Sequence, residues 1–169
     1  MGAFPGDVWF WFVPCVLASA YALGVLREWR RDKSVRVSRL ASFITGCALL
    51  GFAMSPEMVH WAHIDLRGHM AQHLLLGMFA PVALVYAAPG TLLVRNMPVA
   101  GARRLMVLAG ARPVRLLIHP VTAALLSVGV MYVIYLTPAF AFTQESPEAH
   151  LFLHVHFLIA GYLFTWSIA

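Results

Sequence analysis

The chain has 169 residues, of which 61% are hydrophobic and only 11% charged, with a mean hydropathy of +0.78. This composition excludes a soluble domain and predicts an all-α membrane protein, a polytopic transmembrane helix bundle of about five spans with roughly 20 apolar residues each. The net charge of +5 does not indicate nucleic-acid binding, because the basic residues stand between apolar runs as topology signals.

The first two predicted spans flank the most basic segment of the chain. Residues 8–26 form the first span, and the segment Arg27–Arg39 carries six cations against two acids, which predicts a cytoplasmic loop and an N-terminus outside. The second span covers residues 40–61. Leu40–Met54 alone is too short for a hydrocarbon core of roughly 30 Å, so we expect this helix either to continue through a kink at Pro56 towards Trp61 or to end at a shallow depth.

Three further spans are predicted at residues 69–88, 120–136 and 149–169, which completes a single transmembrane domain over residues 1–169. Between the third and fourth spans, Thr91–Leu117 mixes arginines with leucines and valines and predicts a cytoplasmic interfacial helix. The two inner loops then hold eleven of the twelve Lys and Arg residues. This bias supports the orientation and places seven of the eight histidines at or just below the outer surface.

Two HxxxH pairs stand out among these histidines. His69 and His73 open the third span, and His150 and His154 open the fifth. A spacing of four residues puts both members of a pair on one helix face, and both pairs enter the membrane from the same side, so they can face each other. Imidazoles suit copper, zinc, iron or nickel, and ionisable residues inside a span are costly enough to indicate function. We therefore predict a metal site.

Other histidines and two methionines lie near these pairs. His156 is about 200° round its helix from His154 and points elsewhere. The secondary candidates for the site are His60, His63, Met58 and Met70. The methionines offer thioethers, which favour Cu(I), and the two histidines would meet an arriving ion first. Because only neutral imidazole binds metal, we expect affinity to fall below about pH 6.5.

A set of short motifs adds a resemblance to a known family. The motifs are Ser55-Pro56, GHMAQHLLL (residues 68–76), AAPGTLLVRNMP (87–98), IHP (118–120), YLTP (135–138) and HLFLHVHFLIAGYLF (150–164). Together they resemble the caa3-type CtaG family of membrane proteins, which are associated with cytochrome c oxidase assembly. Members of that family continue past the fifth span into further helices, so we expect this chain to be a truncated, degenerate or partial form.

The resemblance implies a non-enzymatic factor that helps to mature a haem–copper oxidase by handling copper. The positions that match the family's histidines are His69, His73, His150, His154 and His156. The implied partners are membrane lipid, a cytochrome c oxidase subunit and a copper donor protein, with oligomerisation allowed and nucleic acid excluded. We expect the protein in a bacterial-type plasma membrane, with the histidine cluster on the outer face as the positive-inside bias predicts.

Three alternatives to copper delivery stay open. A membrane di-metal oxygenase also uses HxxxH boxes and would make the protein an iron enzyme, although adjacent His-His pairs are missing from the sequence. A bis-histidine haem protein would use His73 and His154 as axial ligands. A purely structural membrane subunit needs no metal, because histidine rings are tolerated at a membrane interface. Copper is therefore the predicted cofactor, with haem or iron as the alternatives.

Overall fold

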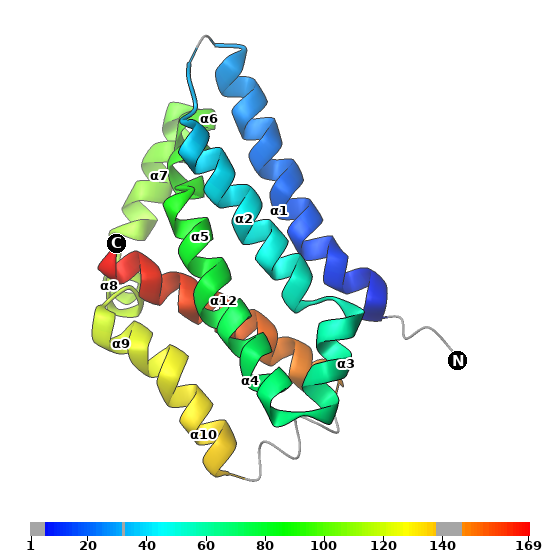
Figure 1. The fold of residues 1–169 in the computed structure, drawn as a ribbon. Coiled ribbons are helices and arrows are strands. Elements are labelled where there is room, and N and C mark those ends of the chain that lie inside the picture. Colours follow the sequence, from blue (N-terminus) through cyan, green and yellow to red (C-terminus); the bar gives the residue numbers. More distant parts are fainter. Residues whose placement is uncertain (1–5, 32, 138–146) are drawn as a thin grey trace.

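The computed structural model describes residues 6–31, 33–137 and 147–169, and for residues 6–11, 13, 135, 147, 148 and 150 it describes the backbone only. All regular structure in these residues is helical (Figure 1), which confirms the predicted all-α class. In chain order the elements are α1 (Gly6–Trp29), α2 (Val37–Ala53), α3 (Pro56–Ile64), α4 (Leu66–Leu74), η1 (Leu75–Phe79), α5 (Ala80–Tyr86), α6 (Pro89–Asn96), α7 (Val99–Ala109), α8 (Arg112–Leu117), α9 (Pro120–Ala124), η2 (Leu125–Gly129), α10 (Val130–Leu136) and α12 (Pro147–Ile168). Segments η1 and η2 are π-helical turns that join α4 to α5 and α9 to α10.

The break between α2 and α3 is set by the local sequence. The Ser55 hydroxyl accepts a hydrogen bond from the backbone N–H of Met58 at 3.3 Å, and Pro56 opens the new helix; both residues favour a helix start. The axes of α2 and α3 differ by 51°, which confirms the kink predicted at Pro56. Helix α3 packs against α4, whose first turn is capped by Asp65 through a 2.8 Å bond from the backbone N–H of Arg67.

Two helical stretches of the described chain are long and apolar enough to cross a membrane. They are Leu66–Tyr86 and Leu151–Ile168, and the bent pair Val37–Ala53 with Pro56–Ile64 makes a third if it counts as one span. These three correspond to the third, fifth and second predicted spans. The apolar helix Pro120–Ile134 is shorter. The described helices thus support a membrane protein with two or three candidate spans, and the predicted total of five stays a prediction.

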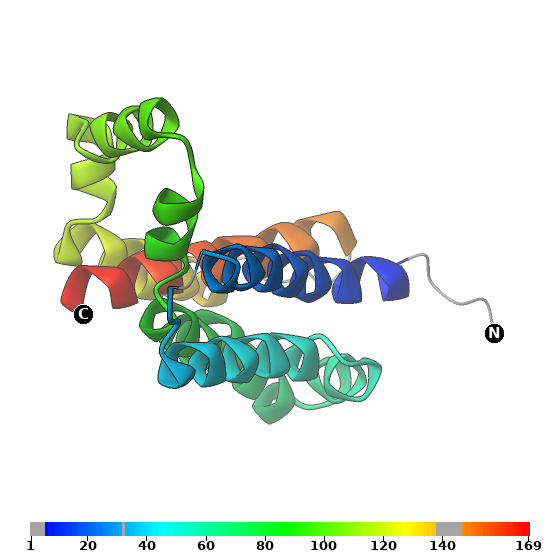
Figure 2. The same cartoon turned by 90° about the horizontal axis from the view of Figure 1, so that it is seen from above.

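The segment expected as one interfacial helix forms three short helices, α6, α7 and α8. Pro98 stands at the start of α7 and Pro113 lies in the first turn of α8, where a proline is tolerated but a continuing helix is not. No residue of these three helices is buried, and apolar side chains such as Met106 and Leu108 are exposed. Seen from above, α6–α8 stand to one side of the other helices (Figure 2).

The buried core lies between α1, α2 and the α4–η1–α5 helix. Tyr21 stacks on Phe43 with 3.8 Å between ring centroids, and Leu76 and Leu84 continue the same cluster. Gly46 on α2 lets α5 approach closely, since a Cβ atom there would lie 2.8 Å from the Leu84 side chain. This packing fixes the α4–η1–α5 helix, which carries the first histidine pair.

Helix α12 packs against η1, α5 and α9. The two backbones come close at Gly161, where a Cβ atom would overlap the backbone carbonyl oxygen of Gly77 in η1. Two glycines therefore bring two backbones into contact, as small residues do in membrane helix pairs. This contact brings the histidines of α12 alongside those of α4.

Candidate metal centre

The first histidine pair forms a direct contact inside α4. His69 and His73 are both buried, and their Nε2 atoms lie 3.0 Å apart. The rings meet edge to face with 4.5 Å between centroids. The expected one-turn spacing is therefore realised with both imidazoles turned to the same point. A hydrogen bond between two imidazoles needs one N–H donor and one acceptor, so one ring of the pair carries its proton on Nε2.

The separation of these two nitrogens suits a shared ion. A metal bound about 2.0–2.1 Å from each nitrogen, in tetrahedral geometry, separates two ligand nitrogens by roughly 3.3 Å. The observed 3.0 Å is within a few tenths of an ångström of that value. A metal ion could thus take the place of the proton that now joins His69 to His73, with small ring movements.

A third imidazole comes from α12. His154 is buried, and its ring centroid lies 5.9 Å from that of His73. Phe157, one turn further along α12, covers another side of His73 with 4.7 Å between ring centroids. The Gly77–Gly161 contact explains why the two helices run so close here. His73 therefore stands between His69 and His154, at the end of the bundle formed by the α3–α4 turn, which we call the histidine end.

The three imidazoles do not form a closed ligand set. Among the described side chains, no three His, Cys, Asp or Glu residues converge on one point that could hold a metal ion. His150 lies one turn before His154 in α12, as predicted from the spacing, but its side chain is outside the described residues. The described chain thus offers a close pair of ligands and a third ring nearby.

His156 faces a different helix. Its Nε2 atom lies 3.0 Å from the backbone carbonyl oxygen of Leu126 in η2. Because a carbonyl only accepts, Nε2 of His156 donates this bond and Nδ1 alone could bind a metal. The prediction that His156 points away from His154 agrees with this contact. The structure therefore places His156 as a link between α12 and η2, apart from the His69–His73 pair.

The secondary candidates lie on α3 and α4 around the pair. His63 is exposed, and its Nδ1 atom lies 2.7 Å from the carbonyl oxygen of Val59. His60 is also exposed. Met70 is exposed on α4, whereas Met58 is on the buried face of α3. His60, His63 and Met70 are thus accessible beside a buried pair.

Gln72 is a residue of the site that the sequence analysis missed. It is only 1% exposed, and its Nε2 atom donates a 2.8 Å hydrogen bond to the carbonyl oxygen of Ala53 at the end of α2. This bond fixes α4 against the α2–α3 break, and with it the orientation of His69 and His73. An amide inside the apolar stretch between two histidines was the available signal, because buried polar side chains need a partner.

Comparisons with known proteins agree with the resemblance seen in the motifs. The model of the cytochrome c oxidase caa3 assembly factor family (Caa3_CtaG) matches residues 19–169, so the chain belongs to this family. Uncharacterized proteins of Mycobacterium bovis and Mycobacterium tuberculosis are each 39% identical over 160 residues, which is 90% of this chain and 24% of the relative. One from Mycobacterium leprae is 36% identical over the same shares. The chain therefore spans about a quarter of the length of these curated relatives, and no solved structure matches it.

Proposed function

We propose that this member of the caa3 assembly factor family is a non-enzymatic membrane protein that binds copper and passes it to a cytochrome c oxidase subunit. The observation that carries the proposal is the 3.0 Å approach of the His69 and His73 Nε2 atoms, with His154 beside them on a second helix. Copper is here the cargo, and a separate donor protein would supply it.

A metal site with unfilled coordination positions suits a protein that passes its metal on better than a protein that keeps it. Structural metal sites close all four positions around the ion, which makes release slow. The His69–His73 pair supplies two ligands and leaves the remaining positions for a donor or an acceptor. His154 can enter when the ion arrives, and the exposed Met70 offers a thioether, the ligand type that favours Cu(I). His60 and His63 form the surface that the ion would meet first.

The proposed topology places this site on the outer face of a bacterial-type plasma membrane. The connection between α1 and α2 lies beside the start of α6, and we call this part of the molecule the basic end. In Figure 1 it lies opposite the histidine end. The positive-inside bias assigns the basic end to the cytoplasm. With five spans, the N-terminus and the histidines then share the outer side, where the copper-receiving part of an oxidase subunit could dock.

The haem alternative fits the helix packing less well. A haem between His73 and His154 would need room for a porphyrin between α4–η1 and α12. The backbones of Gly77 and Gly161 leave no gap between those helices a short distance away, and Phe157 already packs on His73. The di-metal oxygenase alternative needs more ligands than the described side chains bring together.

The test is copper binding by purified protein in mild detergent, measured by competition with a coloured Cu(I) chelator. His73→Ala should lower the affinity by roughly 100-fold or more, since even the partners of a ligand are worth 10- to 100-fold. His119→Asn is the matched control. His119 caps α9 by accepting a 3.3 Å bond from the backbone N–H of Val121, and asparagine keeps that function.

Two results would count against copper carriage. One is the absence of copper binding by the wild-type protein, and the other is an affinity that His73→Ala leaves unchanged. A visible absorption spectrum of the protein purified from cells grown with iron separates the haem alternative, because a bis-histidine haem absorbs strongly and copper(I) does not.

A further inference from the structure

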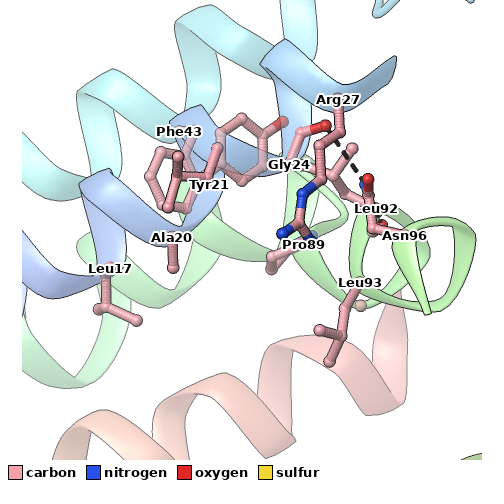
Figure 3. Close-up of a pocket in the computed structure, with 12 residues that line it drawn as sticks. Leu17, Ala20, Tyr21, Gly24, Arg27, Phe43, Pro89, Leu92, Leu93 and Asn96 are labelled. Carbon is pink, nitrogen blue, oxygen red and sulfur yellow. Dashed lines mark hydrogen bonds between the residues drawn. The ribbon is translucent and has the colours of Figure 1, made fainter. Parts of the chain in front are cut away.

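Two cavities of opposite character adjoin at the basic end, far from the histidines. The larger is an apolar groove of about 500 Å³ between α1, α2 and α6, a volume within the roughly 300–1,000 Å³ range of small-ligand sites. Its apolar walls include Leu17, Ala20 and Leu93. Figure 3 shows Arg27 and Asn96 at one end of the groove and Leu17 at the other. The groove is therefore apolar along its length and polar at one end.

The smaller cavity is strongly basic. It measures about 170 Å³ and lies where the α1–α2 connection meets the start of α6. Three arginines line it, Arg36, Arg39 and Arg95, together with the hydroxyl-bearing residues Ser34 and Thr91. Guanidinium and hydroxyl groups together are the donors that proteins use for phosphate oxygens.

The two cavities share a wall. Tyr21 and Leu92 line both of them. Tyr21 is held in place from two sides, because its hydroxyl donates a 3.2 Å bond to the Ala87 carbonyl oxygen and its ring stacks on Phe43. A ligand that fills both cavities would thus contact Tyr21 with both of its parts. Its polar part would lie in the smaller cavity, and its apolar part would lie in the groove.

The arginine of α6 is also held by the fold. Ala88 adopts a left-handed conformation with φ of 51°, which turns the chain between α5 and α6 and brings Arg95 beside α1. Arg31 donates a 3.4 Å bond to the Arg95 carbonyl oxygen, and the Arg95 guanidinium lies 4.0 Å from the buried Glu28 carboxylate. Among the described residues, Glu28 is the carboxylate that pairs with one of the three arginines of the cavity, so the described lining carries an excess of positive charge.

We propose that the basic end binds an anionic phospholipid. Its phosphate lies in the cavity lined by Arg36, Arg39 and Arg95, and one acyl chain lies in the apolar groove. Charge complementarity selects an anion, and the adjoining groove selects an anion with an apolar tail. The location agrees with a cytoplasmic leaflet rich in anionic lipid, which attracts arginines near the membrane surface.

The test titrates delipidated protein in detergent with phosphatidylglycerol, with phosphatidylcholine of the same acyl chains, and with inorganic phosphate. Binding is measured by native mass spectrometry and by the shift of the thermal unfolding midpoint. The wild-type protein should bind phosphatidylglycerol at least tenfold more tightly than phosphatidylcholine. The double variant Arg36→Gln/Arg39→Gln should lose at least about tenfold of that affinity, since each near-surface arginine is worth about fivefold.

Two matched controls separate the site from general effects. Arg103→Gln/Arg104→Gln removes the same charge from exposed positions of α7 and should change the affinity less than twofold. Ala20→Phe places a ring in the groove and should weaken both phospholipids while leaving any phosphate binding unchanged. Ala41→Phe adds the same ring at an exposed position of α2 outside both cavities, and should leave lipid binding as in the wild type.

Each remaining outcome overturns the proposal. Equal losses in the two double arginine variants would mean that affinity follows net charge alone. Inorganic phosphate that binds as tightly as phosphatidylglycerol, with no effect of Ala20→Phe, would assign the cavity to a free anion. Equal affinity for the two phospholipids would mean that the arginines do not select an anionic lipid. All variants can be checked for folding by their circular dichroism, and none touches the histidine end.

Discussion

Substitution of Gly161 by alanine tests the helix contact on which the histidine arrangement depends. The added Cβ would overlap the carbonyl oxygen of Gly77 and lie 2.7 Å from its carbonyl carbon, so α12 would have to move away from η1 by about 1 Å. Overpacking of this kind costs roughly 1–3 kcal/mol, and a gap of 0.5–1 Å also forfeits about a quarter to a half of each contact energy. Alanine regains up to about 1 kcal/mol of helix propensity. The net loss in unfolding free energy should be roughly 1–3 kcal/mol.

The assay is denaturant unfolding in detergent, followed by circular dichroism, together with the copper competition described above. Gly129→Ala is the control, because a Cβ there would be 3.8 Å from the Leu125 side chain, an ordinary contact. The control should be neutral or slightly stabilised. Gly161→Ala should also weaken copper binding, because the shift of α12 moves His154 away from His73. Wild-type stability and copper affinity in Gly161→Ala would refute the contact and its role in the site.

Three further results are expected. Gln72→Leu should lower the unfolding free energy by roughly 1–2 kcal/mol, because the Ala53 carbonyl loses its buried donor; an unchanged thermal midpoint would contradict this bond. His156→Phe should cost about 1 kcal/mol through the lost bond to Leu126 but leave copper affinity intact, and a large loss of copper binding would instead make His156 a ligand. Copper affinity should be constant well above about pH 6.5 and fall below it, since protonated imidazole cannot bind metal; a flat profile between pH 5 and 8 would argue against imidazole ligands such as His73.

Features governed by nearby residues were predictable from the sequence. The apolar composition predicted a helical membrane protein, and Pro56 predicted the bend between α2 and α3. The four-residue spacing predicted that His69 and His73 lie on one face of a helix. Each depends on interactions within a turn or two of the same chain segment. The family was also predictable, because motifs such as GHMAQHLLL combine several uncommon residues in a fixed order.

Features that join distant segments were not predictable. Gly161 contacts Gly77, from which it is separated by 84 positions in the sequence. The residues around either glycine do not indicate which other segment it contacts. The partner of His156 depends on where η2 lies, and a π-helical turn has no strong sequence signature. The left-handed Ala88 is equally hidden, because that conformation normally indicates glycine or asparagine. The basic cavity, which depends on that turn, was therefore beyond the reach of sequence patterns.

The π-helical turn η1 has a consequence for the direction in which the histidines point. A π-helical turn holds one more residue than an α-helical turn over nearly the same length, and each residue of an α-helix advances by about 100°. If the same residues formed a regular α-helix with Leu84 kept against Gly46, His69 and His73 would therefore be rotated by about 100° about the helix axis, away from His154. Loss of one residue within Leu75–Phe79 would instead turn the π-helical turn into an α-helical one and leave the histidines facing His154. The π-helical turn accommodates the extra residue and so maintains the angular phase between the half of this helix that packs the core and the half that carries the imidazoles.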